Sequence, residues 1–158
     1  MKYYEEQDKK NIERIRAIQK ELPSFCRSFF YDIADYTSTR TRLAYAYDLK
    51  VFFEFLHKNN AYCRKMEIPE IPISVLDRVT KDDILEYLDY MTLYDKDGRV
   101  IMNKERGKAR KIASLRSFYN YFFRSEKIEK NPASLIPVPK QHEKEIIRLE
   151  PQEVAILL

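Results

Sequence analysis

Glycine is scarce in this chain of 158 residues, which contains only Gly98 and Gly107. A β-sandwich or barrel needs many tight turns and normally uses more glycine than this. Two cysteines, Cys26 and Cys63, are too few for a disulfide framework, so we expect a reducing, cytoplasmic location. No apolar run approaches the roughly 18 residues that a membrane span requires. The charged N-terminus also lacks the apolar segment of a secretory signal, and we expect no membrane association.

Recognisable catalytic and metal-binding motifs are also lacking. The only histidines are His57 and His142, and the sequence contains no HExxH, CxxC or GxSxG motif and no glycine-rich phosphate loop. The spacing of the two cysteines and two histidines fits no zinc-binding pattern. We therefore expect no catalytic residue, no metal site and no cofactor in these residues.

Charge is distributed unevenly along the chain, although the net charge is only +4. Residues 67–97 carry nine acids and three bases, which gives −6, whereas residues 99–127 carry nine bases and two acids, which gives +7. A strongly basic segment can present a positive face to a polyanion such as double-stranded DNA. An ordinary solvated helix face is the alternative interpretation of the same pattern.

Apolar residues recur at helical spacing through most of the chain, which predicts an all-α fold in about one domain. Helices are expected over residues 2–22, 25–36, 39–58, 80–94 and 103–125, with a short one after Asn131-Pro132. Residues 61–76 are expected to form a connector. The Asp97-Gly98 pair favours a small hairpin within residues 94–103.

Two helix surfaces are candidate DNA contacts. Arg110, Ser114 and Ser117 recur at i, i+4 and i+7 and are expected on the solvent side of the basic helix. Small residues there would let the backbone approach DNA while the arginine reaches a phosphate or a guanine edge. At the start of the 39–58 helix, Thr41 and its neighbours supply hydroxyls, arginines and free N–H groups that suit a phosphate.

Four sequence segments resemble the phage-integrase and Xer-like tyrosine recombinases. In chain order they are Thr41-x-x-x-Tyr45-x-x-Asp48-Leu49-x-x-Phe52, then Lys108 to Tyr121, then Asn131-Pro132-Ala133 with Pro139-Lys140, and finally Leu149 to Leu158. The resemblance covers about residues 23–158. It implies a small orthogonal bundle of four to five helices, the SAM-like core-binding domain, over residues 23–140. An extension helix over 1–22 would precede this domain, and a linker and the start of a catalytic domain over 141–158 would follow it.

The resemblance also implies a function. The core-binding domain of this family clamps double-stranded DNA at the recombination core site, and the parent enzyme assembles as a homotetramer on DNA. Strand cleavage is the task of a separate domain with a tyrosine nucleophile, expected beyond residue 158. The implied DNA contacts, with their basic neighbours, are Arg40, Thr41, Arg42, Lys108, Arg110, Lys111, Ser114, Arg116 and Lys140.

Two other functions remain open at this point, a helical protein-interaction module and a helix-turn-helix regulator. The regulator would require two short helices joined by a tight turn. The role of residues 1–22 is also open, because they could form an arm, a partner contact or a packing helix.

Overall fold

The computed structural model describes residues 2–137, so the expectations for Lys140 and for residues 141–158 lie outside it. The described part contains six α-helices: α1 (Tyr3–Gln19), α2 (Arg27–Ile33), α3 (Thr39–Asn59), α4 (Val75–Arg78), α5 (Lys81–Thr92) and α6 (Glu105–Arg124). One hairpin, β1 (Leu93–Lys96) and β2 (Arg99–Met102), lies between α5 and α6. Four short 3-10 helices complete it: η1 (Ser24–Cys26), η2 (Cys63–Lys65), η3 (Ile68–Glu70) and η4 (Pro132–Leu135). The predicted all-α class with a small hairpin is confirmed.

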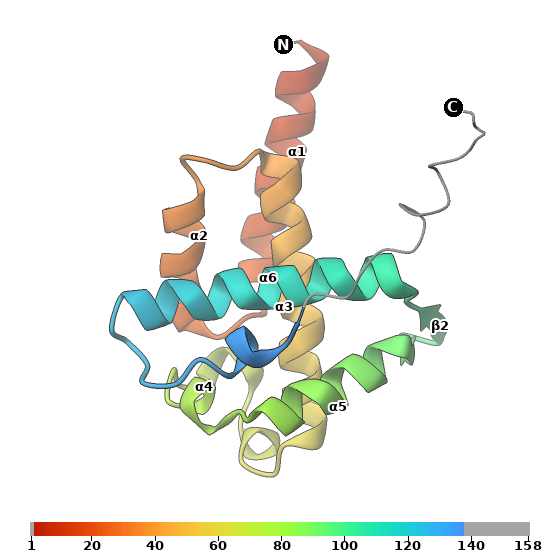
Figure 1. Cartoon of the computed structure of the whole chain (residues 1–158). Helices are drawn as coiled ribbons and strands as arrows, with labels where there is room; N and C mark the ends of the chain where they lie inside the picture. The colour runs from red at the N-terminus through yellow and green to blue at the C-terminus, as the bar shows by residue number, and fades with distance from the viewer. Residues whose placement is uncertain (1, 138–158) are drawn as a thin grey trace, which may run out of the picture.

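Helices α1 and α3 lie side by side, and α6 crosses α3 at a steep angle in front of it (Figure 1). The second half of α1 is part of the core, because Ile15 and Ile18 are buried there together with Leu22. The first half is held at the start of α3, where the Thr39 hydroxyl donates to Asp8 at 2.6 Å and accepts from Asn11 at 3.0 Å. The expected extension is therefore a packing helix in this structure.

Aromatic rings fill the space where α2, α3 and α6 meet. Phe118 of α6 is fully buried, and the ring of Phe122 meets it edge-on at 5.1 Å between centroids. Phe29 of α2 and Phe53 of α3 make similar contacts with it at 5.3 and 6.0 Å. Such pairs add to the free energy gained by burying apolar area. They fix the crossing of α6 over α3, on which the candidate site depends.

Local sequence signals set the bounds of the helices. Ser38 caps α3 by accepting the Thr41 N–H at 3.1 Å. Thr80 and Asp83 form the capping box of α5, in which each side chain accepts the backbone N–H of the other residue. The expected connector over residues 61–76 contains η2, η3 and the start of α4 rather than only extended chain.

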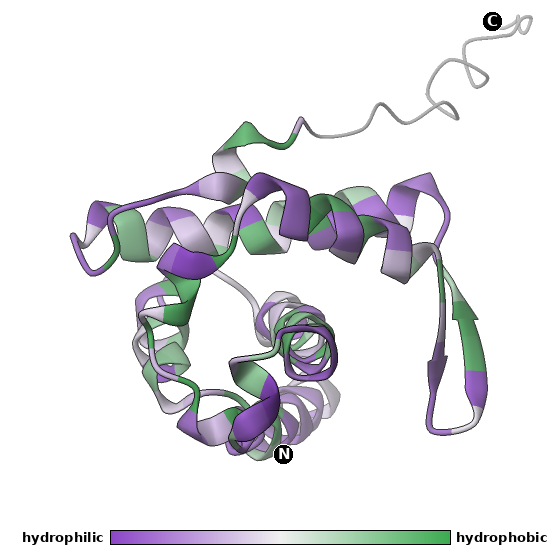
Figure 2. Cartoon of the chain, turned by 90° about the horizontal axis from the view of Figure 1, so that it is seen from below, coloured by the Kyte–Doolittle hydropathy of each residue, from purple (hydrophilic) through white to green (hydrophobic). Residues whose placement is uncertain are grey.

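The hairpin projects from the bundle at the end where α5 meets α6 (Figure 2). Its two-residue turn places Asp97 at φ 52° and Gly98 at φ 83°, in the left-handed region that a tight hairpin turn requires. Leu93 pairs with Met102 and Asp95 with Val100, so these four side chains share the outer face. Tyr94 on the other face packs against the core.

Candidate nucleic-acid interface

The centre of the candidate interface is a buried acid on α3, Asp48, which is 3% exposed. Its Oδ1 lies 2.9 Å from Nη2 of Arg110 and 3.3 Å from Nζ of Lys111 on the crossing helix. Its Oδ2 accepts a hydrogen bond from Oγ of Ser114 at 2.7 Å. A buried carboxylate needs such partners to offset the loss of water. Two cations share one carboxylate, so the cluster of Asp48, Arg110, Lys111 and Ser114 carries a local charge of +1.

Arg110 is the member of this cluster that reaches solvent. More than half of its side-chain surface is accessible, 57%, although one end of the guanidinium is bound to Asp48. A guanidinium has five N–H donors in a rigid plane, and the contact with Asp48 leaves others available. Arg110 is therefore held in one orientation while it can still donate to an external anion.

Ser114 and Lys111 lie inside the bundle. The prediction that Ser114 lies on the solvent side of α6 is wrong, because the residue is 3% exposed and faces α3. Its small side chain fits the helix crossing and supplies a donor to Asp48. Lys111 is 7% exposed, and burial lowers the pKa of its ammonium group, against an opposing effect of Asp48. These two residues contribute charge and support rather than accessible surface.

The start of α3 lies on the same side of that helix as Asp48. Thr41 precedes Asp48 by seven residues, or nearly two turns, which places it about 10 Å along the axis on the same face. Its N–H and hydroxyl both bond to Ser38. Arg42 donates to the carbonyls of Ala34 at 2.9 Å and Thr37 at 2.7 Å, which ties the end of α2 to α3. Arg40 is exposed.

The remaining candidates hold neighbouring elements to α6. Lys108 donates to the hydroxyl of Thr92 at 3.3 Å, next to the hairpin. Arg116 donates to the carbonyl of Ile136 at 2.6 Å, near the end of the described chain. The structure thus brings Arg110, Lys111 and Ser114 together, and leaves Lys108 and Arg116 on either side of them along the same helix.

Asp48 is the functional residue whose role sequence reasoning missed. It stands beside Leu49 and one turn before Phe52, at a position that the apolar period of α3 assigns to the interior. An acid at an interior position requires a buried partner. The interior acid was therefore a signal in the sequence, although it does not identify Arg110, Lys111 and Ser114 as its partners.

Comparison with known proteins gives three informative relatives, all described as tyrosine recombinase XerC. The protein of Caldanaerobacter subterraneus subsp. tengcongensis is 36% identical over 128 residues, which cover 77% of this chain and 35% of that protein. The protein of Leptospira interrogans serovar copenhageni is 32% identical over 103 residues, covering 65% of this chain and 27% of the relative. That of Anoxybacillus flavithermus is 29% identical over 117 residues, covering 74% and 33%.

The chain is a homologue of the Xer-like tyrosine recombinases. This Xer-like homologue spans between about a quarter and a third of the length of the curated relatives it matches (27%, 33% and 35% in these three). No protein-family model and no solved structure matches it. Among residues 2–137, no helix is both long and apolar enough to cross a bilayer. The same residues contain no cluster of three or more His, Cys, Asp or Glu side chains that could hold a metal ion.

Proposed function

We propose that this chain is the DNA-binding part of a site-specific tyrosine recombinase and clamps one side of the recombination core site. The observation that carries the proposal is the fixed, solvent-facing guanidinium of Arg110 on the basic helix of an XerC homologue. The whole recombinase would act as a homotetramer on double-stranded DNA. We assign none of the described residues a role in strand cleavage.

Within this proposal the residues have different tasks. Arg110 contacts the DNA directly, and Arg40 and Thr41 contact a phosphate about two turns away along α3. Lys108 and Arg42 raise the local positive potential, while Lys111 and Ser114 act through Asp48. Arg116 binds the carbonyl of Ile136 and so holds the end of the described chain to α6. We propose that Lys140 also contacts a phosphate.

Asp48 is the positioning residue of this interface. An arginine on a flexible stem loses rotamer entropy when it binds a phosphate. The 2.9 Å contact with Asp48 fixes Arg110 before DNA arrives, so less entropy is lost on binding. Lys111 offsets the negative charge of Asp48, so that the carboxylate does not cancel the field that Arg110 presents.

Binding of a fluorescein-labelled duplex of about 30 base pairs, followed by anisotropy as salt is raised, tests the proposal. If about six phosphates are neutralised, log Kd should change with log salt with a slope near 5 in magnitude. Asp48→Asn should weaken binding, although it changes no group that touches DNA. An absence of duplex binding at low salt would contradict the proposal.

The helix-turn-helix alternative fits the structure less well. Helix α6 is joined to α5 by the hairpin rather than by a tight turn, and α6 itself is a long helix of 20 residues. The protein-interaction alternative predicts concentration-dependent oligomers without DNA affinity. Sedimentation velocity with and without the duplex distinguishes it from the proposal.

A further inference from the structure

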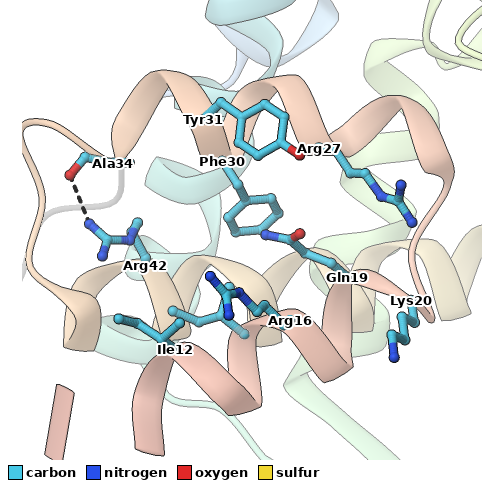
Figure 3. A pocket seen from close by; sticks show the side chains of 10 residues that line it. Ile12, Arg16, Gln19, Lys20, Arg27, Phe30, Tyr31, Ala34 and Arg42 are labelled. Carbon is cyan, nitrogen blue, oxygen red and sulfur yellow. Dashed lines mark hydrogen bonds between the residues drawn. The ribbon is translucent and has the colours of Figure 1, made fainter. Parts of the chain in front are cut away.

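A second surface feature lies between α1 and α2. It is a groove of about 480 Å³ that ends at the first turns of α3 (Figure 3). Its floor is apolar and is formed by Ile12, Ile15 and Phe30. Ile15 and Phe30 are buried, and Ile12 is half-buried. The apolar surface that a ligand can cover is therefore mainly that of Ile12, together with the exposed ring of Tyr31 at the edge of the groove.

The charged residues on the rim of the groove are all cationic. Arg16 and Lys20 come from α1 and its end, Arg27 from the start of α2 and Arg42 from α3. None of the acidic residues in the described part of the chain lines the groove. Arg16, Lys20 and Arg27 are exposed and form no ion pair with any residue in the 2–137 range. Four positive charges around an apolar floor leave a surface whose charge is unbalanced.

We propose that this groove binds an acidic amphipathic helix of a partner protein. Apolar side chains at i, i+3, i+4 and i+7 of such a helix would cover the floor. Aspartate and glutamate on its flanks would meet the arginines and Lys20, and this complementarity would set orientation and partner choice. The proposal does not depend on the proposed DNA-binding function.

The lining residues distinguish this groove from the candidate DNA interface. None of them belongs to α6, and Arg42 is the only one that we also place near the DNA. A phosphate backbone could pair with the rim but would leave the apolar floor uncovered. A helix with one acidic and one apolar face satisfies both parts. The bundle could therefore hold DNA on α6 and a protein segment between α1 and α2 at the same time.

The test uses the full chain and a fluorescein-labelled model peptide of about five helical turns. The peptide has leucine at i, i+3, i+4 and i+7 spacing and glutamate at most other positions. One control peptide replaces the glutamates by lysine, and a second keeps the glutamates and replaces the leucines by glutamine. The double variant R16E/R27E changes the rim. R64E/K65E is the matched control, since it alters the net charge equally at exposed residues of η2 outside the groove.

We expect the acidic peptide to bind the unaltered chain and both control peptides to bind poorly. R16E/R27E should raise the Kd for the acidic peptide at least about tenfold, because attraction is replaced by repulsion, whereas R64E/K65E should change it less than about twofold. Circular dichroism of each variant confirms that the bundle is folded.

Any of five results would overturn the proposal. The first is that the acidic peptide does not bind, and the second is that both charge variants weaken its binding equally. The glutamine peptide binds as well as the leucine peptide, which would show that the floor is not used. If R16E/R27E weakened duplex DNA binding much more than R64E/K65E does, the groove would be assigned to nucleic acid. If sedimentation showed self-association that only R16E/R27E abolished, the groove would be assigned to a second copy of the chain.

Discussion

Arg110 and Ser114, one turn apart on α6, bind the two different oxygens of the same Asp48 carboxylate, at 2.9 and 2.7 Å. One residue of this pair is largely open to solvent and the other is buried. The two contacts of Asp48 therefore connect the buried crossing of α3 and α6 with the exposed guanidinium of Arg110. Stability of the bundle and orientation of the exposed arginine depend on the same acid.

Replacing Asp48 should destabilise the fold. Asp48→Ala leaves the ammonium group of Lys111 buried without a counter-charge, and we expect a loss of about 3–5 kcal/mol in the free energy of unfolding. Asp48→Asn keeps the shape and should cost less. Urea denaturation measures both changes. Adding Lys111→Met to Asp48→Ala should recover much of the loss, and a single variant as stable as the parent would contradict the assigned role.

The stability contribution of Lys111 should depend on pH. Burial lowers the pKa of Lys111 from its ordinary value of 10.5, so the folded chain releases this proton at a lower pH than the unfolded chain. Between the lowered pKa and 10.5 the unfolded state binds more protons, and the free energy of unfolding rises with pH. The stability of the parent relative to Lys111→Met should therefore increase as the pH rises from neutral toward 10.5. Urea titrations across this range test it, and a constant or falling difference would be inconsistent with burial of the charge.

Arg110→Ala should weaken duplex binding by about tenfold at fixed salt and reduce the magnitude of the salt slope by about one. The Kd of Arg110→Lys should lie between those of the parent and of Arg110→Ala. An ammonium group keeps the charge, but it lacks the planar fork with which a guanidinium contacts Asp48 and a phosphate at the same time. Arg124→Ala is the control on the same helix, with the same change in charge at an exposed position. Anisotropy titrations at several salt concentrations measure the Kd and the salt slope of the three variants. Equal losses for Arg110→Ala and Arg124→Ala would show that only net charge matters.

Gly98→Val should disrupt the hairpin without unfolding the bundle. Gly98 has φ 83°, and a β-branched residue in this region costs roughly 1–2 kcal/mol. Nothing lies within 4 Å of a Cβ built there, so the cost comes from the backbone alone. Hydrogen exchange should accelerate at the amides of β1 and β2 while those of α3 and α6 stay protected. Unchanged exchange in the hairpin would contradict the turn geometry.

The capping box of α5 should contribute about 1 kcal/mol, because Thr80→Ala removes the acceptor of the Asp83 N–H. Lys81→Ala, at the next position, removes no cap and serves as the control. Thermal unfolding followed by circular dichroism compares the two variants. A larger loss for Lys81→Ala would show that the cap is not the stabilising element.

The local features of the fold could be predicted from short-range signals. The turn at Asp97-Gly98 and the Thr80 cap each depend on residues within four positions, and both are present. The crossing of α6 over α3 could not be predicted in this way. It depends on contacts between residues more than 60 positions apart, such as Asp48 with Arg110 and with Ser114.

The error at Ser114 has the same origin. A helical wheel of α6 alone assigns Ser114 to the polar side, because the wheel of one helix does not show which other helix packs against it. A buried acid on α3 converts part of that polar side into an interior surface. Phe122 is buried on the side that the helical period of α6 assigns to the core, whereas the polar contact beside this side depends on the partner helix.

The bond from Arg116 to the carbonyl of Ile136 couples the outgoing chain mechanically to the helix that carries Arg110. A pull applied at Pro137 would load α6 near its middle, instead of first straightening the loop over residues 125–131. The contact therefore keeps residue 136 against the middle of the helix that carries Arg110.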